Sequence, residues 1–256
     1  MTDINLSRLH RWGEGIFTTL LIQSGHPVNL DAHLVRLKQA GQLIGLTPAL
    51  DREFFLQQIS RLSHGTNCVI RLEFSVPDDL TDPPQVSLSA RPLPKEWSQL
   101  PETGVSLVES AISYSPPFPD VGWIKWNAWQ PWAILRRQLQ SEWDVIVTDG
   151  SEWLETTRAG LVAVRNDEWF TNQSGGRCLK STAIAAVKIW RETLGLTVQE
   201  TVFTREFCNE VSQWFVANAV IGLVPVVSIT LRDGLVRSFP PANGPAHEFR
   251  TWYLNR

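Results

Sequence analysis

Residues 113–131 read Ser113-Tyr-Ser-Pro-Pro-Phe-Pro-Asp120-Val-Gly122-Trp-Ile-Lys125-Trp-Asn-Ala-Trp-Gln-Pro131. Three prolines stand among the first eight of these residues. Proline lacks the backbone N–H that a helix interior or a central strand needs, so this stretch is the predicted linker between two domains. We expect a smaller N-terminal domain at residues 1–118 and a larger C-terminal domain at residues 119–256, with Lys125 close to their junction.

Hydrophobic periodicity on both sides of the linker predicts an α+β protein. Runs of β-forming residues indicate strands, and apolar residues three and four positions apart indicate helices. Asp31 is the expected N-cap of the first helix, which Gly45 ends, and Ser24-Gly25-His26-Pro27 is a turn signal. The predicted elements are, in chain order, a strand at 15–22, helices at 31–44 and 52–62, strands at 69–74 and 86–90, a helix at 128–141, strands at 144–148 and 161–164, a helix at 182–194, and strands at 197–202, 214–217 and 224–229.

The composition excludes several classes of function. Of the 256 residues, 43% are apolar and 19% are charged, as in an ordinary globular protein. The formal net charge is -3 and there is no basic run, so we expect no nucleic-acid partner. No apolar run reaches the roughly 18 residues that span a bilayer. The three isolated cysteines have neither disulfide nor metal-ligand spacing, and the polar start lacks a secretion signal, so we expect no metal and a cytoplasmic location.

Two motifs stand near the N-terminus, Gly13-Glu14-Gly15-Ile16-Phe17-Thr18-Thr19 and His33-Leu34-Val35-Arg36-Leu37. They resemble the Gly-Asp/Glu-Gly-x-Phe-Glu/Thr-Thr strand and the His-x-x-Arg-Leu helix of the class-IV aminotransferase family. The resemblance implies that Arg36 binds the phosphate of pyridoxal 5'-phosphate (PLP), a role that suits a planar, permanently charged donor. Read without the motif, Arg36 is an ordinary surface arginine.

Lys125 is similar in position to the lysine that carries PLP in this family. The resemblance therefore implies a Schiff base at Lys125, within a pattern that reads Lys-x-x-Asn-Tyr/Arg in the family and has Ala128 and Trp129 here. A Schiff-base lysine must be desolvated to keep its amine neutral, and Trp123, Trp126 and Trp129 are the candidates to do so. The alternative is a lysine whose apolar stem lies along these neighbours.

Glu155 follows the turn Asp149-Gly150 in a stretch similar to the family's Asp-x-Gly-x-Val-x-Glu-x-x-x-Ser-Asn. The resemblance implies that its carboxylate pairs with the protonated pyridine nitrogen of PLP and keeps the ring an electron sink. Glu152 is a competing candidate in the same turn. Ala159-Gly160 departs from the family's Ser-Asn pair.

Two further stretches resemble the family's phosphate-binding segments. Cys178-Leu179-Lys180-Ser181-Thr182-Ala183 matches a segment that opens a helix, and implies that Ser181 and Thr182 bind the phosphate at the helix N-terminus. The alternative is an ordinary helix cap. Lys180 and Ala183 depart from the pattern. The stretch Phe215–Val226 is similar to the family's Phe-Leu-Thr-Asn-Ser-Leu-x-Gly-Val-x-Pro-Val, and implies that Asn218 and Ala219 reach the phosphate.

Taken together, the resemblance spans residues 13–229 and implies a two-domain fold-type-IV PLP enzyme, like D-amino-acid aminotransferase, with a cofactor cleft between the domains. Phe17-Thr18-Thr19 is most similar to bacterial aminodeoxychorismate lyases, which release pyruvate and leave 4-aminobenzoate for folate synthesis. Two alternatives stay open: a branched-chain or D-amino-acid aminotransferase, and a non-catalytic relative. The small-molecule amino substrate is bound by residues that the sequence leaves unassigned, with Arg91 and Tyr114 as possibilities. Family members usually work as homodimers, so the resemblance implies a homodimer.

Overall fold

The computed structural model describes residues 8–46, 49–116, 118–128, 130–173 and 175–256, with the side chain of Pro119 excepted. The chain forms two compact units, Met1–Leu93 with Ile124–Pro131, and Pro94–Trp123 with Trp132–Arg256. This division differs from a single cut between residues 118 and 119, because Ile124–Pro131 returns to the first unit and the stretch after Leu93 joins the second. Each unit combines a sheet with helices, which confirms the α+β class.

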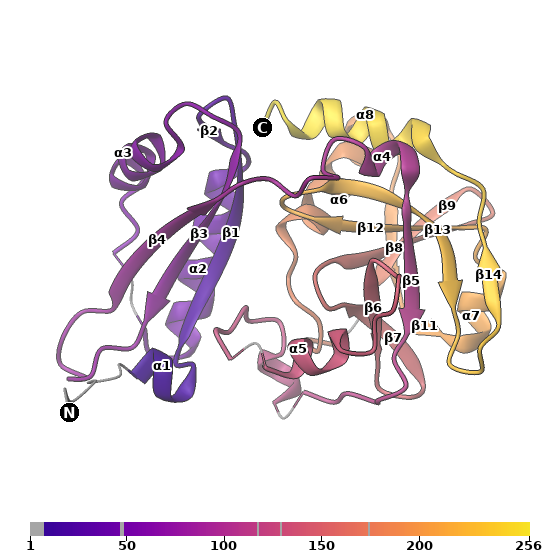
Figure 1. Cartoon of the computed structure of the whole chain (residues 1–256), viewed down its shortest axis with the longest axis horizontal. Helices are drawn as coiled ribbons and strands as arrows, with labels where there is room; N and C mark the ends of the chain where they lie inside the picture. Colours follow the sequence, from indigo (N-terminus) through magenta and orange to yellow (C-terminus); the bar gives the residue numbers. More distant parts are fainter. Residues whose placement is uncertain (1–7, 47–48, 117, 129, 174) are drawn as a thin grey trace. The chain divides into compact units, whose positions relative to one another are not determined.

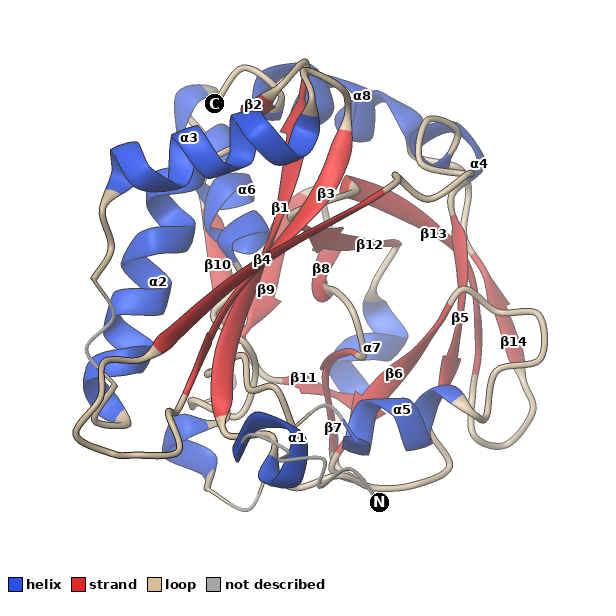
Figure 2. Ribbon diagram, turned by 60° about the vertical axis from the view of Figure 1, so that its left-hand side comes forward, coloured by secondary structure: helices blue, strands red, loops and turns tan. Residues whose placement is uncertain are grey.

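The first unit is a four-stranded antiparallel sheet in the order β2-β1-β3-β4 (Figures 1 and 2). Helix α2 lies against β1, and α3 lies against β2 and β4. The elements of this unit are α1 (Arg8–Trp12), β1 (Gly15–Gln23), β2 (His26–Pro27), α2 (Leu30–Leu43), α3 (Arg52–Ser63), β3 (Cys68–Ser75) and β4 (Gln85–Arg91). Long apolar side chains of β1 and β3, such as Leu20, Ile22 and Ile70, are fully buried, so β1 and β3 form the centre of this core.

In the first unit the predicted hairpin turn forms, but the predicted cap of α2 does not. Ser24 and Gly25 both have positive φ, 50° and 82°, which suits a tight hairpin between β1 and β2. Asp51 caps α3 by accepting from two backbone N–H groups. The prediction of Asp31 as the N-cap of α2 is wrong: the cap is Asn29, in the left-handed region with φ 57°, and Asp31 lies in the first turn.

The second unit is built on a ten-stranded mixed sheet in the order β10-β9-β8-β12-β13-β5-β6-β7-β11, with β14 paired to β13. The pairs β9–β10, β5–β13 and β5–β6 are parallel, and the other pairs are antiparallel. Its strands are β5 (Val105–Glu109), β6 (Asp144–Thr148), β7 (Glu152–Thr156), β8 (Gly160–Arg165), β9 (Glu168–Asn172), β10 (Val198–Thr201), β11 (Phe203–Thr204), β12 (Gln213–Asn218), β13 (Gly222–Thr230) and β14 (Val236–Ser238).

Helices cover this second sheet, and aromatic rings fill its core. Helix α8 (Asn243–Tyr253) lies against β13 and α6 (Thr182–Thr193) against β12. Trp214 is fully buried, and its ring centroid lies 5.4 Å from that of Trp153 and 5.1 Å from that of Phe203. The short helices are α4 (Leu100–Thr103), α7 (Arg205–Glu210) and the 3-10 turn η1 (Pro119–Val121). Among the described residues, no helix has the length and apolar character needed to cross a membrane.

Helix α5 (Gln130–Arg136) is shorter than the sequence predicts. The expected helix at 128–141 is wrong at both ends. After Arg136 the backbone tightens into i→i-3 bonds, from Arg137 N to Ile134 O and from Gln138 N to Leu135 O. The Gln138 side chain then bonds to Ala111 N at 2.9 Å and to Ser110 Oγ at 3.3 Å. These long-range bonds, absent from any local pattern, end the helix.

Candidate active site

A buried hydrogen-bond chain joins the two N-terminal motifs in the first unit. Thr18 on β1 and His33 on α2 are fully buried, and Arg36, one helical turn after His33, is only 8% exposed. Arg36 Nη2 donates to Thr18 Oγ1 at 2.7 Å, and Thr18 Oγ1 lies 2.5 Å from His33 Nδ1. The His-x-x-Arg spacing puts both side chains on one helix face, so Thr18 fixes the direction of the guanidinium.

His33 is neutral in this cluster. Burial lowers the pKa of His33 well below its ordinary value, and the positive charges of Arg36 and Lys125 act in the same direction. A neutral imidazole can accept a hydrogen bond from the Thr18 hydroxyl or donate one to it, according to which ring nitrogen carries the proton. The cationic side chains named in this cluster are therefore Arg36 and Lys125.

Lys125 lies on the segment that returns to the first unit. Phe17 N donates to Lys125 O at 3.0 Å, and Asn127 N donates to Gly15 O at 3.0 Å, so the segment runs along β1 beside the first motif. Lys125 is half-buried, and its Nζ lies 5.0 Å from the centroid of the Phe17 ring. Consecutive residues of β1 thus contact the two predicted cofactor residues: Phe17 contacts Lys125, and Thr18 contacts Arg36.

The tryptophans predicted to desolvate Lys125 have different positions. Trp126 is half-buried and pairs with β1 through its backbone. Trp123 is buried in the second unit, where Lys180 Nζ lies 4.2 Å from its ring centroid. Trp129 lies outside the described residues. Within the first unit, Phe17 is an aromatic contact of Lys125 that the sequence prediction missed.

Sequence reasoning also missed Arg71 on β3. Its Cζ lies 3.6 Å from the centroid of the same Phe17 ring. Arg71 Nη2 lies 2.7 Å from Glu73 Oε2 and donates to Asn127 Oδ1 at 2.5 Å. Arg71 and Glu73 are two residues apart on a strand, and this alternation could have indicated a shared face. Phe17 thus has two cations, Arg71 and Lys125, against its ring.

Glu155 is a buried carboxylate on β7 of the second unit, 8% exposed. Its Oε1 accepts a hydrogen bond from Leu179 N at 3.3 Å. Burial raises the pKa of the Tyr114 phenol, and the negative charge of Glu155 adds to this effect. Tyr114, one of the two residues left open for the substrate, therefore lies within the field of Glu155. Arg91, the other, is exposed at the end of β4 in the first unit.

The predicted helix start is present at α6. Ser181 is the N-cap, and its Oγ accepts from Ile184 N at 3.3 Å. Thr182 is the first helical residue and is buried. A twelve-residue helix with a serine cap has the N–H groups and dipole that favour an anion. Lys180 is exposed, so the departure from the family pattern at this position adds a cation without filling the core.

Two departures from the family pattern have a packing reason. Ala183 is fully buried in the first turn of α6. At Gly160, a Cβ would lie 2.7 Å from Ile184 Cγ1, closer than real Cβ atoms come to other atoms. The side chain of Ile184 thus takes the space that a larger residue would need at position 160. Both small residues let α6 pack closely on β8.

The turn between β12 and β13 uses the Asn218 side chain internally. Asn218 Oδ1 accepts from Val220 N at 2.9 Å and from Ile221 N at 3.0 Å, and its Nδ2 donates to Arg158 O at 3.2 Å. These bonds fix the turn on which Ala219 lies. In the β8–β12 register Asn218 follows Ala217, the partner of Gly160. The predicted phosphate residues of the second unit therefore gather at one end of β8.

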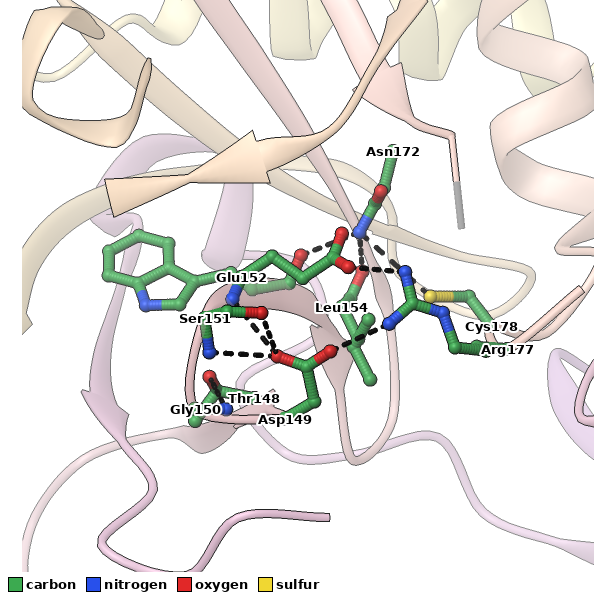
Figure 3. Close-up of polar contacts among 10 residues, drawn as sticks. Thr148, Asp149, Gly150, Ser151, Glu152, Leu154, Asn172, Arg177 and Cys178 are labelled. Carbon is green, nitrogen blue, oxygen red and sulfur yellow. Dashed lines mark hydrogen bonds and ion pairs between the residues drawn. The ribbon is translucent and has the colours of Figure 1, made fainter. Parts of the chain in front are cut away.

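An ion-pair cluster occupies the turn between β6 and β7 (Figure 3). Arg177 Nη1 lies 2.7 Å from Asp149 Oδ2, and Nη2 bonds to Glu152 Oε1. The competing candidate Glu152 is thus held by a cation. Arg177 stands 25 and 28 residues along the chain from these partners, so no local pattern points to it. Arg177 is a third residue that sequence reasoning missed, after Phe17 and Arg71.

The Thr156-Thr157-Arg158 sequence after Glu155 has a structural role. Asp144 is fully buried, and it accepts hydrogen bonds from Thr157 Oγ1 and, at 2.9 Å, from Arg158 N. Thr156 Oγ1 donates to Ala159 O at 3.0 Å. These bonds fix the turn that leads from β7 into β8. The residues after Glu155 therefore hold the strand that carries it.

A sequence model described as amino-transferase class IV matches residues 15–229. This range nearly coincides with the span of the motifs. No curated protein sequence matches the chain. The comparison with solved structures finds fold relatives of low sequence identity.

A hypothetical aminotransferase from Mycobacterium tuberculosis in its apo form is 18% identical with a TM-score of 0.84, and the alignment covers 100% of this chain and 95% of that one. A 4-amino-4-deoxychorismate lyase from Pseudomonas aeruginosa is 17% identical, with a TM-score of 0.83 over 97% of this chain and 93% of that one. A branched-chain aminotransferase from Thermoproteus uzoniensis with norvaline is 17% identical, with a TM-score of 0.82 over 97% and 88%. The M. tuberculosis protein was also solved in a PLP-bound form. These relatives confirm the predicted fold type.

Proposed function

The chain belongs to the class IV aminotransferases, a family of PLP-dependent enzymes, and from this premise we propose that it is a 4-amino-4-deoxychorismate lyase. It would release pyruvate and leave 4-aminobenzoate for folate synthesis. The observation that carries the proposal is Thr18, buried between His33 and Arg36. Many family members have glutamate at this position. A hydroxyl there gives the cluster a hydrogen-bond partner without a negative charge, as in the lyases that the first motif resembles.

The donor set of this chain fits PLP. The cofactor has an aldehyde, a phosphate and a ring nitrogen, which call for an amine, for cationic or N–H donors, and for a carboxylate. Lys125 supplies the amine, and Arg36 with the Ser181–Thr182 helix start supplies the donors. Glu155, buried and fixed by Leu179 N, supplies the carboxylate.

We assign each of these side chains one role. Lys125 would hold the cofactor through its amine and would move protons at the reacting carbon of the substrate. In the first unit we assign Arg36 to the phosphate. In the second unit we assign the same role to Ser181, Thr182, Asn218 and Ala219. Because the Asn218 side chain is used within its turn, the backbone of this turn is the part assigned to the phosphate.

The remaining roles concern charge and water. Glu155 keeps a proton on the ring nitrogen, and the bound cofactor then supplies a cationic ring that stabilises negative charge at the substrate carbon. The ring of Phe17 lies against the Lys125 amine and covers it on one side.

One assay separates the activities that the family allows. Purified protein reconstituted with PLP is given aminodeoxychorismate, and pyruvate release is compared with amino transfer from amino acids to 2-oxo acids. We expect pyruvate release, and we expect Lys125→Ala to abolish it. Amino transfer without pyruvate release would instead place the chain among the aminotransferases. Failure to take up PLP at all would make it a non-catalytic relative.

We also propose a homodimer located in the cytoplasm. The family resemblance supports the dimer. The cysteines Cys68, Cys178 and Cys208 are all free, which suits a reducing compartment. Sedimentation of the purified protein tests the dimer directly, and a monomer at micromolar concentration would refute it.

A further inference from the structure

The loop that joins β9 to α6 is held by β7 at both of its ends. Asn172 Nδ2 donates to Trp153 O at 2.6 Å and to Leu154 O at 2.8 Å, where the loop begins. Leu179 N donates to Glu155 Oε1 at 3.3 Å, where the loop ends. Three consecutive residues of β7 therefore carry this loop, and the last of them is the proposed partner of the ring nitrogen.

Between these two ends, the side chain of Arg177 bridges two carboxylates of the β6–β7 turn (Figure 3). The side chains of Arg177, Asp149 and Glu152 are 23%, 19% and 10% exposed, so solvent screens these ion pairs only in part. A planar guanidinium holds two carboxylates in fixed directions, which the single ammonium of a lysine cannot do. Arg177 thus ties the loop to the turn at two points.

Asp149 is a rigid acceptor for this bridge. Its Oδ1 accepts from Ser151 N at 2.9 Å, Ser151 Oγ at 2.8 Å and Glu152 N at 3.0 Å, which leaves Oδ2 to face Arg177. Burial opposes the charge of Asp149, but these hydrogen bonds and Arg177 hold its pKa below the ordinary value. Burial also opposes the charge of Arg177, but Glu152 and Asp149 raise its pKa. Asp149 and Arg177 both stay charged at neutral pH.

The opposite side of the loop is packed against residues 122 and 123. A Cβ on Gly122 would lie 2.9 Å from Gly176 O and 3.0 Å from Arg177 O. Lys180 N donates to Trp123 O at 3.3 Å. The backbone on both sides of Arg177 therefore has little room to move, and a change at its side chain is passed on to the residues that follow.

We propose that Arg177 is a positioning residue for the cofactor: by clamping Asp149 and Glu152 it holds Leu179 N on Glu155 and sets the start of α6 at Ser181. In this proposal Arg177 acts on the cofactor only through Glu155 and the start of α6, without touching cofactor or substrate. The inference therefore rests on the proposed function. Arg177 stands two residues before Leu179 and four before Ser181. Loss of a comparable outer-shell contact at a metal site costs about tenfold to hundredfold in affinity or rate, and we expect a similar loss of PLP affinity.

Four variants separate the clamp from a simple charge balance. Arg177→Met removes the clamp but leaves two carboxylates without their cation. The triple variant Asp149→Asn/Glu152→Gln/Arg177→Met removes the cation and both negative charges together, so only the clamp is missing. Arg177→Lys keeps the charge without the planar fork. Arg165→Met is the matched control, because it breaks an ion pair with Glu210 elsewhere in the same unit.

The first measurement is PLP affinity, by absorbance titration of the cofactor-free full chain, alongside its melting temperature. We expect the triple variant to melt near the wild type yet bind PLP about tenfold more weakly. Arg177→Lys should bind with intermediate affinity, and Arg165→Met should bind as the wild type does. If the triple variant binds PLP as tightly as the wild type, Arg177 only balances charge and the proposal is wrong.

The second measurement is hydrogen exchange in the cofactor-free protein, which does not depend on the proposed function. We expect the amides of residues 179–184 to exchange faster in the triple variant, with those of α8 unchanged. Unchanged exchange at 179–184 would overturn the clamp even if the wild type took up no PLP. If the wild-type protein takes up no PLP but residues 179–184 still exchange faster in the triple variant, the proposed function is refuted. The clamp by Arg177 is then still supported.

Discussion

Acid should destabilise this protein through His33, by an amount that follows from its burial. His33 is fully buried beside Arg36 and Lys125, so the folded protein keeps it neutral and its pKa lies well below the ordinary value. In the unfolded chain a histidine titrates near pH 6.5. Below that pH the unfolded state binds a proton that the folded state does not. The free energy of unfolding therefore falls as the pH decreases, with a limiting slope of about 1.4 kcal/mol per pH unit.

The size of the effect can be worked out for a fall from pH 7 to pH 5. With an unfolded pKa of about 6.5, and with His33 kept neutral by burial in the folded protein over this range, His33 alone removes about 2 kcal/mol. For a chain of this length, that corresponds to roughly 4–8 °C in melting temperature. His33→Asn removes the titrating group while keeping a polar atom near the position of Nδ1. Between pH 7 and pH 5, the free energy of unfolding of His33→Asn should therefore fall by about 2 kcal/mol less than that of the wild type.

The assay is urea unfolding of the cofactor-free protein at pH 7, 6 and 5. Thr18→Val serves as the control, because it removes the hydroxyl between His33 and Arg36 but leaves the imidazole buried. It should lower stability at every pH, by about 1–3 kcal/mol, and keep the acid sensitivity of the wild type. If His33→Asn loses as much stability as the wild type between pH 7 and pH 5, the reasoning is refuted.

Three further predictions concern the second unit. Gly160→Ala should lower the free energy of unfolding by about 1–3 kcal/mol in urea titrations, because the new Cβ meets Ile184 at 2.7 Å; an unchanged midpoint would contradict this packing. Glu155→Gln should keep the melting temperature and lower kcat by about a hundredfold, since the charge at the ring nitrogen is lost. A variant with the kcat of the wild type would contradict the role of Glu155 at the ring nitrogen. Burial raises the pKa of Cys208 to about 12, so Cys208 should react with a thiol reagent at pH 8 only after unfolding, and rapid labelling of the folded protein would contradict this.

Local sequence patterns are sufficient for much of this fold. The strand at 144–148 appears as predicted, and β1 and α6 differ from their predicted bounds by one residue, because each has its own apolar pattern and a turn or cap residue at its end. Strands β9 and β14 were not predicted. Each pairs with the strand directly before it, β9 with β8 across the turn at Asn166-Asp167 and β14 with β13. Their apolar runs are too short to indicate a strand by themselves.

The candidate site, like the fold, was predictable from the sequence only in part. Motif order was enough to single out Arg36, Lys125 and Glu155, and the structure shows all three in polar or aromatic contacts within their own units. The partners that hold the site were not predictable. Thr18 gains its role from a bond across 18 residues to Arg36, and Arg177 from bonds across 25 and 28 residues. Such contacts depend on the tertiary fold, which a single sequence leaves open.

The most direct test of the central claim is to locate the cofactor on the chain. The protein is reconstituted with PLP, reduced with borohydride to make the linkage permanent, digested and examined by mass spectrometry. We expect a reduced phosphopyridoxyl group on Lys125 and on no other lysine. Labelling of Lys180 in place of Lys125, or no labelling of any lysine, would contradict it.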